Sequence, residues 1–406
     1  MGLDLTKLDA ALKEHYTDER VQNLTYQQNP FFALCPKYER FGGRNLPIPL
    51  IYGNPQSRSR TFGTAQTQSA TSSSLVDAFT LTRVKDYAIA TIDNETMEAS
   101  EGDKNAFIEA ATTEIDGAMN ALTNSLAMNQ YKSGYGERGQ VGADTGTVIT
   151  LKRVSDIVNF EVGMLLQVSD TIGASVLRDS GAAITVTAVD RTDGKITYTG
   201  TIAGQAVDDY LFAQGDRESA ASPSRTMCSG LAAWVPSTAP TGGDNFFGVD
   251  RSKDVTRLAG YRLSAAGMSI EEALIEGESL VSRGGFYIDH YFMSFKKMAE
   301  LKKSLGSKVQ YVDLQANPKV SFRGVLIDGN KTTVRCVADR NCPDDTVYGV
   351  AINMFKYYSL GKAVRMIGND GNMWLRQASA DGIEVRVGYY GNLGCRAPGY
   401  AVNIQF

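Results

Sequence analysis

Two closely spaced prolines exclude a helix from one segment near the start of the chain. Residues 45–52 read Asn-Leu-Pro-Ile-Pro-Leu-Ile-Tyr. Proline lacks a backbone N–H and clashes with the preceding turn of a helix. Proline is tolerated in edge strands, so this segment is predicted to be an exposed edge strand. Any fold for this chain has to accommodate an extended, poorly covered strand at this place.

A polar stretch and a second extended segment follow. Residues 53–74 consist mainly of Gly, Asn, Ser, Thr and Gln, and the chain then returns from Leu75 to Ile92. The apolar side chains that alternate in one register of this return strand are Phe79, Leu81, Tyr87 and Ile89. Two extended arms around a mobile polar tip predict a protruding β-hairpin. The alternative is a disordered loop.

The apolar period changes to that of a helix between Lys104 and Tyr131. Apolar residues recur every three or four positions from Ile108 to Leu126, without proline. This spacing predicts an amphipathic helix of about seven turns. Glu109 and Asp116 lie seven residues apart and are therefore expected on one polar face of it. Leu5, Leu8, Leu12 and Tyr16 predict a second, shorter amphipathic helix within the first twenty residues.

The middle of the chain differs from its surroundings. Residues 141–217 contain short β-rich runs, and Asp193-Gly194 is a specific hairpin-turn signal between two of them. A small all-β insertion, a barrel or a sandwich, is predicted here. Helices return after a linker at 219–243, where Ser269-Ile-Glu-Glu272 forms a capping box. Strands are expected to dominate from Val309 onwards.

Few residues offer catalytic or metal chemistry. The two histidines are His15, expected on a solvated helix face, and His290, expected as a core or interface residue of an aromatic strand. Gly134-Tyr-Gly-Glu-Arg-Gly139 matches a dinucleotide-binding pattern, but it follows a helix and precedes strands, the reverse of the required order. We therefore predict no catalytic residue, no cofactor, no metal and no enzyme, although paired carboxylates cannot be recognised from sequence.

The cysteine pattern and the hydropathy indicate the compartment. Five scattered cysteines do not form a disulfide framework, so a reducing compartment is expected. The first residues lack the apolar core of a secretory signal, and no run of eighteen apolar residues occurs. A chain made in a cytoplasm, without a membrane partner, is expected.

Charge is balanced overall but segregated locally. With 41 Lys plus Arg against 45 Asp plus Glu, the net charge is −4, so the chain is not expected to wrap nucleic acid. The charged residues between Arg40 and Val76 are all arginines, including Arg58 and Arg60. Residues 93–116 are strongly acidic. An arginine-bearing hairpin and an acidic helix of another copy can be complementary; the alternative is that both are simply solvated.

The order of these parts resembles the HK97-fold major capsid proteins of tailed bacteriophages. The resemblance includes Asn245-Phe-Phe-Gly-Val-Asp-Arg-Ser252, Asp381-Gly-Ile-Glu-Val-Arg386 and Gly391-Asn-Leu-Gly-Cys-Arg-Ala-Pro398. It covers nearly the whole chain except 141–217, and the order of elements carries more weight than any single motif. It implies an α+β fold with the following parts: N-terminal arm 1–39, E-loop hairpin 40–95, P-domain spine helix 96–140, inserted all-β domain 141–217, P-domain 218–254, A-domain 255–360 and closing P-domain strands 361–406.

The resemblance also implies a function. Hexamers and pentamers would form an icosahedral shell, the virion capsid, around double-stranded DNA, and the shell would assemble in the bacterial cytoplasm. Scaffolding, portal and decoration proteins are possible partners, and DNA contact would be weak and non-specific. In this family the E-loop lies over a neighbouring P-domain, so Arg58 and Arg60 are expected to face Glu109 and Asp116 of an adjacent copy.

One departure from some family members concerns covalent crosslinking. An isopeptide bond needs a lysine in the E-loop, and no lysine occurs between Lys37 and Lys85. The shell is therefore expected to rest on non-covalent contacts, including the N-terminal arm and the β insertion. Alternative functions are an encapsulin-like nanocompartment shell, a β-rich hydrolase or sugar-binding protein, and a tail or baseplate protein.

Overall fold

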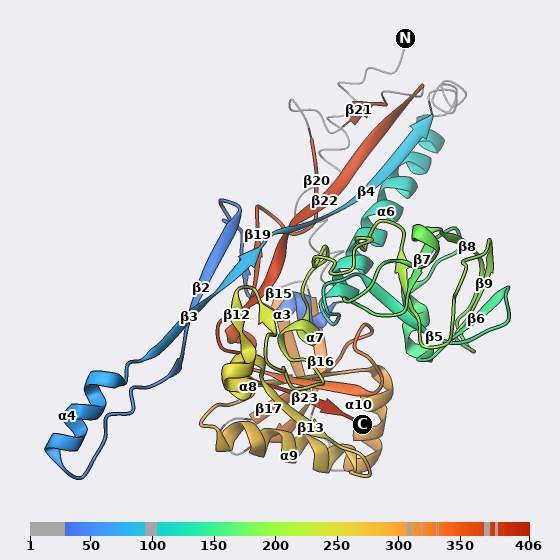
Figure 1. Ribbon diagram of the computed structural model, residues 1–406. Coiled ribbons are helices and arrows are strands. Elements are labelled where there is room, and N and C mark those ends of the chain that lie inside the picture. Colours follow the sequence, from blue (N-terminus) through green and yellow to red (C-terminus); the bar gives the residue numbers. More distant parts are fainter. Residues whose placement is uncertain are drawn as a thin grey trace.

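The computed structural model describes residues 29–93, 104–306, 311–317, 320–329, 331, 333–368, 374–377 and 381–406. The amphipathic helix expected within the first twenty residues lies outside this part. The described chain forms two β-sheets, a closed barrel and a protruding hairpin (Figure 1). In these residues no helix combines the length and the apolar content needed to cross a bilayer.

The first sheet has six strands and carries the long helix. Its strands are β1 (Lys37–Tyr38), β4 (Val84–Asp93), β19 (Phe355–Ser359), β20 (Arg365–Met366), β21 (Trp374–Arg376) and β22 (Gly382–Cys395). Strand β4 pairs antiparallel with β22 along its whole length, from Val84 to Asp93. Helix α6 (Lys104–Asn129) runs beside this pair in Figure 1. Its buried residues Ile115, Met119, Leu122 and Leu126 have the spacing that the sequence predicts.

The second sheet has seven strands and carries two shorter helices. In spatial order the strands are β13 (Tyr261–Ser264), β23 (Ala401–Gln405), β18 (Thr346–Val350), β14 (His290–Met293), β17 (Thr333–Ala338), β16 (Val320–Asp328) and β15 (Tyr311–Asn317). Helices α9 (Ile270–Arg283) and α10 (Phe295–Leu305) share a hydrophobic core with it. Ser269 caps α9 by accepting a hydrogen bond from the Glu272 N–H, as the sequence predicts.

Chain order does not separate the two sheets at residue 360, where the expected A-domain ends. Strand β19 precedes that residue but pairs with β22 in the six-stranded sheet. Strand β23 follows it but lies between β13 and β18 in the seven-stranded sheet. The reason is pairing between distant segments: the last strand completes the sheet that the residues after 260 begin.

The segment predicted as an all-β insertion forms a closed six-stranded barrel, which begins at Glu137 instead of residue 141. Its strands are β5 (Glu137–Asp144), β6 (Val148–Leu151), β7 (Leu165–Ser169), β8 (Ile184–Asp190), β9 (Lys195–Thr199) and β10 (Tyr210–Ala213). The barrel has its own hydrophobic core. Strands β8 and β9 pair across the Asp193-Gly194 turn, where Gly194 has φ +66°. Closure leaves this domain without a free sheet edge.

The protruding hairpin consists of β2 (Asn45–Gly53) and β3 (Leu75–Thr82) in antiparallel register. The sequence predicts a mobile polar tip, but residues Phe62–Thr71 form helix α4. This stretch contains no proline and includes Ala and Gln, which allow a helix.

The return segment also differs from the prediction, because a break at Arg83 divides it into β3 and β4. Phe79 and Leu81 are buried, but Tyr87 and Ile89 are 47% and 53% exposed. Ala90 and Ile92 are buried instead. Because Arg83 belongs to neither strand, the alternation of buried and exposed side chains shifts by one residue between β3 and β4.

Three short α-helices and one small hairpin also belong to the described part, besides short 3-10 helices. The helices are α3 (Pro30–Leu34), α7 (Leu231–Trp234) and α8 (Val255–Ala259). Strands β11 (Asn245–Phe246) and β12 (Val249–Asp250) pair with each other. Three of these elements contact the hairpin base. Trp234 of α7 packs on Phe79 of β3, the Phe247 carbonyl between β11 and β12 accepts the Thr80 N–H at 2.7 Å, and Arg257 of α8 donates to the Tyr52 carbonyl at 2.6 Å.

Candidate functional site

The base of the protruding hairpin is held rigidly. The Phe79 ring lies 5.0 Å from Trp234 and 6.2 Å from Phe246, between ring centroids. The Trp234 Nε1–H donates to the Leu393 carbonyl at 3.0 Å. The Asn392 amide donates to the Thr82 carbonyl at 2.9 Å. Aromatic contacts and satisfied buried donors of this kind fix the direction in which the hairpin leaves the body.

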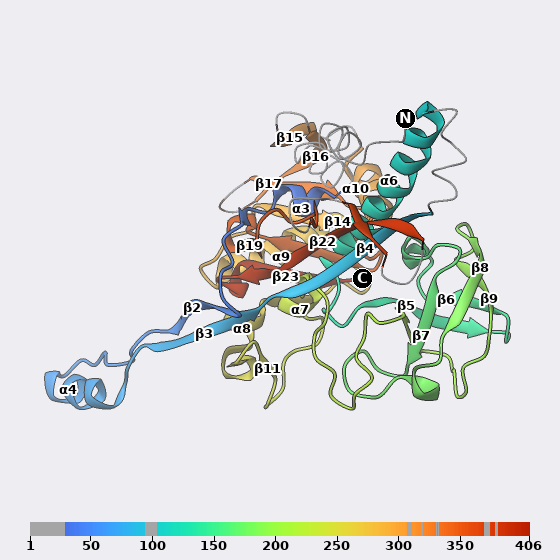
Figure 2. The same cartoon turned by 90° about the horizontal axis from the view of Figure 1, so that it is seen from above.

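Beyond this base the hairpin leaves the body, and its apolar side chains are uncovered. Figure 2 shows α4 at the free end, far from the sheets. Ile51 and Val76 are cross-strand partners and are 70% and 60% exposed. Phe62 is 83% exposed, Leu75 is 48% exposed, and α4 has no buried residue. We call Ile51, Phe62, Leu75 and Val76 the hairpin patch. A patch at the end of an extended arm indicates a contact with another molecule.

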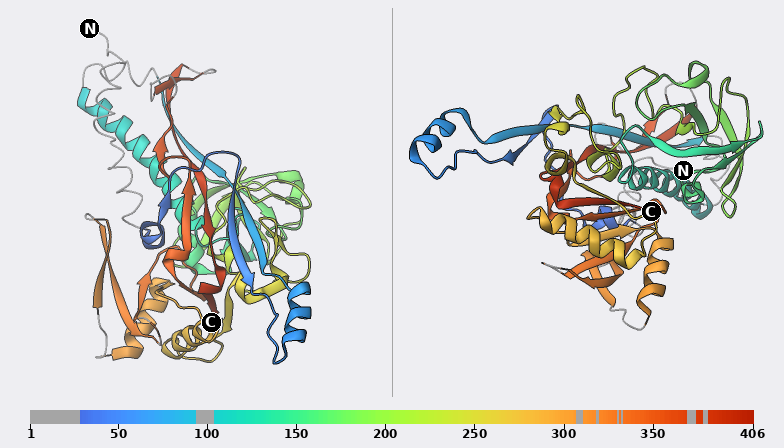
Figure 3. Two further views of the ribbon diagram at one scale, coloured as in Figure 1. Left: turned by 90° about the vertical axis from the view of Figure 1, so that its left-hand side faces the viewer. Right: turned by 60° about the horizontal axis from the view of Figure 1, so that its bottom comes forward.

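The structure does not bring the predicted charge partners together within one chain. Arg58 and Arg60 are exposed and lie just before α4. Asp116 lies on α6, which is well separated from the hairpin tip in Figures 1 and 3. The Asp116 Oδ1 atom is buried and, among the described residues, accepts no hydrogen bond. The side chain of Glu109 lies outside the described part.

His290 is a buried structural residue in the described chain. Its Nδ1 lies 2.7 Å from Asp289 Oδ1, and its ring stacks on Phe292. The same Asp289 oxygen accepts the Ile352 N–H at 2.9 Å. The pair thus links β14 to the segment after β18. His15 lies outside the described residues.

The cysteines are buried thiols. All five are free, and burial raises the pKa of Cys35 to about 11 and that of Cys228 to about 12. Thiols with such pKa values carry little thiolate at neutral pH and are poor nucleophiles. Among the described residues, no group of three or more His, Cys, Asp or Glu side chains is placed to hold a metal ion.

Sequence reasoning missed a buried aspartate that joins three parts of the fold. Asp339 is 1% exposed, and it accepts hydrogen bonds from the Tyr131 hydroxyl at 2.8 Å and the Phe31 N–H at 3.3 Å. Burial raises the pKa of Asp339. The three residues come from the end of β17, the residues after α6, and α3. They are too far apart in sequence for any local pattern to connect them.

The barrel meets the body through ion pairs beside two cavities. Lys132, which follows α6, pairs with Asp156 of the barrel at 3.2 Å, and Arg153 of the barrel pairs with Asp345 of the body at 2.6 Å. Within the barrel, Arg138 pairs with Asp216 at 3.1 Å. The cavities have volumes of about 220 and 280 Å³. Burial raises the pKa of Asp216 to about 6; Arg138 opposes this shift, and Asp86 adds to it. The Gly134–Gly139 segment leads from α6 into β5 at this junction, and Glu137 accepts the Ser133 N–H at 2.6 Å.

Comparison with known proteins identifies the fold. No family model and no curated protein matches the sequence. A chain of the cyanophage A-1(L) capsid asymmetric unit is similar in structure, with a TM-score of 0.53 over 93% of each chain at 11% identity. The chain has the HK97-like capsid fold.

Two further structures with lower scores were found beside it. A chain from Mycobacterium phage Ogopogo is 10% identical, with a TM-score of 0.43 over 93% of this chain and 92% of that one. An encapsulin from Synechococcus elongatus is 8% identical, with a TM-score of 0.45 over 100% of this chain and 96% of that one.

Proposed function

We propose that this chain is a major capsid protein that assembles as hexamers and pentamers into the icosahedral shell of a tailed phage. The observation that carries the proposal is the hairpin tip: α4 buries none of its side chains within its own chain. An ordered arm with an apolar, uncovered tip is stable in its extended form only when another molecule covers it. The capsid fold favours a second copy as that molecule.

The observed elements correspond to the parts of a capsid subunit in this proposal. The hairpin β2–α4–β3 is the E-loop, and α6 with the β4–β22 pair forms the P-domain. The seven-stranded sheet with α9 and α10 is the A-domain, although its last strand comes from the C-terminal end. The barrel is an inserted domain. Residues 1–39 would act as the arm, of which the structure describes α3 and β1.

The E-loop of one copy would lie over the long helix of the next. Arg58 and Arg60 are exposed at the tip. The Asp116 side chain on α6 is partly exposed. An arginine from a neighbouring copy would pair with the exposed part of this carboxylate, and Glu109 would add a second carboxylate. Each exposed pair contributes only about 0–1 kcal/mol, but repetition around closed rings multiplies the effect.

The location and partners follow from the same proposal. The subunit would be made in the bacterial cytoplasm and would end in the virion shell. Packaged double-stranded DNA would touch the inner wall weakly, because a chain with net charge −4 has no general attraction for phosphate. Scaffolding, portal and decoration proteins would be its other partners.

Deletion of the hairpin tip tests the proposal. Residues 57–71 can be replaced by Asn-Gly, since the Gln56 N–H and the Ser72 hydroxyl already lie 2.5 Å apart. The full chain is expected to sediment as capsomers or shells. The deletion variant is expected to stay a folded monomer with unchanged thermal unfolding. A deletion variant that assembles like the full chain would overturn the proposed role of the hairpin.

A further inference from the structure

Helices α9 and α10 lie next to each other on the seven-stranded sheet. Figure 3 shows them, in gold and orange, at the lower end of the molecule. Each buries one face in the core of that sheet: Ala273, Leu274 and Val281 from α9, and Met298 and Leu301 from α10. The Ser304 hydroxyl at the end of α10 donates to Glu271 of α9 at 3.2 Å. Their inner faces are therefore fixed, and their outer faces are solvent-exposed.

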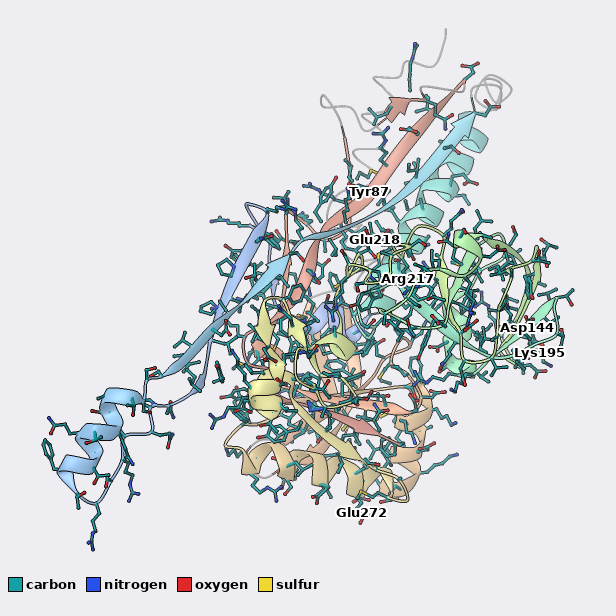
Figure 4. All side chains as sticks on the ribbon, viewed as in Figure 1. Tyr87, Asp144, Lys195, Arg217, Glu218 and Glu272 are labelled. Atoms are coloured by element: carbon teal, nitrogen blue, oxygen red, sulfur yellow. The ribbon has the colours of Figure 1, made fainter. Side chains whose placement is uncertain are left out.

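The two outer faces carry opposite charge. Helix α9 contains four glutamates and one arginine, and α10 contains four lysines and one glutamate. On α9 the exposed residues Glu272 and Glu276 flank Ile275, which is 52% exposed. On α10 the exposed residues Lys296 and Lys303 lie on the same side as Phe295, which is 64% exposed. Figure 4 shows Glu272 projecting away from the body.

These four charges are not neutralised within the described chain. The ion pair formed within α10 joins Lys297 to Glu300 at 2.8 Å. Among the described residues, Glu272, Glu276, Lys296 and Lys303 take part in no ion pair. Each face therefore has an exposed apolar residue beside like charges. Apolar residues bordered by polar ones are typical of protein interfaces.

We propose that the acidic face of α9 in one copy packs against the basic face of α10 in the next copy around a capsomer ring. This inference rests on the proposed capsid function. Ile275 and Phe295 would meet within the contact, and Glu272 and Glu276 would face Lys296 and Lys303. Pairing α9 with α9, or α10 with α10, would bring like charges together, which disfavours those arrangements. A contact between two different surfaces is heterologous, and such contacts generate a ring when the rotation between neighbouring copies closes, as a capsomer requires.

Charge reversal on each face provides the test. One variant carries Glu272→Lys and Glu276→Lys, so that both faces are positive. The other carries Lys296→Glu and Lys303→Glu, so that both are negative. Lys and Glu are both good helix formers, and all four sites are exposed, so the fold should be kept. Thermal unfolding of each variant checks this directly.

The expected results differ for each variant alone and for their mixture. Each variant alone should require at least a tenfold higher protein concentration to form rings in native mass spectrometry. An equal mixture should restore six-membered rings, because the two variants can alternate. Five-membered rings should remain absent, since an odd ring cannot alternate. A Lys152→Glu and Lys195→Glu variant, reversed on the barrel instead, should form rings like the wild type.

The outcomes separate this inference from the proposed function. If the wild type forms rings and both reversal variants form them equally well, the α9–α10 contact is overturned and the capsid function is left intact. Folded variants that lose rings but are not restored by mixing would also overturn it, because the charges would then not face each other. A wild-type chain that stays monomeric at every concentration would overturn both.

Discussion

Replacing two apolar residues of the hairpin patch should weaken assembly without affecting the fold. In the variant Ile51→Thr, Val76→Thr both residues stay β-branched, so the strands keep their propensity. Burying an Ile or Val side chain fully contributes about 1.5–3 kcal/mol. With 70% of Ile51 and 60% of Val76 exposed, covering both would contribute about 2–4 kcal/mol per contact. That corresponds to a factor of roughly 30 to 1,000 in the equilibrium constant of one contact.

Light scattering against protein concentration measures this effect. The variant should need a higher concentration than the wild type before scattering rises, and its urea unfolding as a monomer should stay within about 0.5 kcal/mol of wild type. The matched control is Val162→Thr, Val176→Thr, which removes two side chains of the barrel that are 64% and 55% exposed. Equal assembly of the hairpin variant and the wild type would refute the reasoning.

Three further predictions follow from the same structure. Reversal of the hairpin charges by Arg58→Glu, Arg60→Glu should weaken each subunit contact by up to about 2 kcal/mol, seen as dissociation of the assembled particles at lower urea. Arg40→Glu, Arg44→Glu should have less effect, and equal dissociation of the two variants would count against the tip contact. Trp234→Ala should lower the free energy of unfolding by about 3–5 kcal/mol, because Trp234 is fully buried against Phe79. Urea denaturation of the monomer measures this change, and a loss of less than about 1 kcal/mol would contradict the prediction. Since burial raises the pKa of Asp216 to about 6 from 3.8, its ionisation costs stability as pH rises through that range. Asp216→Asn should therefore gain up to about 3 kcal/mol over wild type between pH 4 and pH 7, and a constant difference across this range in urea titrations would contradict the assignment.

Local patterns were sufficient where one segment determines its own structure. Pro47 and Pro49 exclude a helix, and β2 occupies that place. The three-to-four spacing from Ile115 to Leu126 marks the buried face of α6. The Asp193-Gly194 turn joins β8 to β9. In each case the residues that carry the signal are also the residues that adopt the structure.

Features that depend on contacts between residues far apart in the sequence could not be predicted from local patterns. Arg83 separates β3 from β4 because the first strand pairs with β2 and the second with β22. Strand β23 joins the seven-stranded sheet through pairing with β13 and β18. Buried Asp339 accepts hydrogen bonds from Tyr131 and Phe31, both more than 200 residues away. The contact expected between Arg58 or Arg60 and Asp116 stays a prediction, because it requires a second copy.

Sedimentation combined with negative-stain electron microscopy of the purified full chain tests the central claim most directly. The chain would be expressed alone and together with a candidate scaffolding protein. The account predicts round closed particles, or rings of capsomer size, in the fast-sedimenting fraction. A clean monomer under both conditions would contradict it and would favour a hydrolase or a sugar-binding protein.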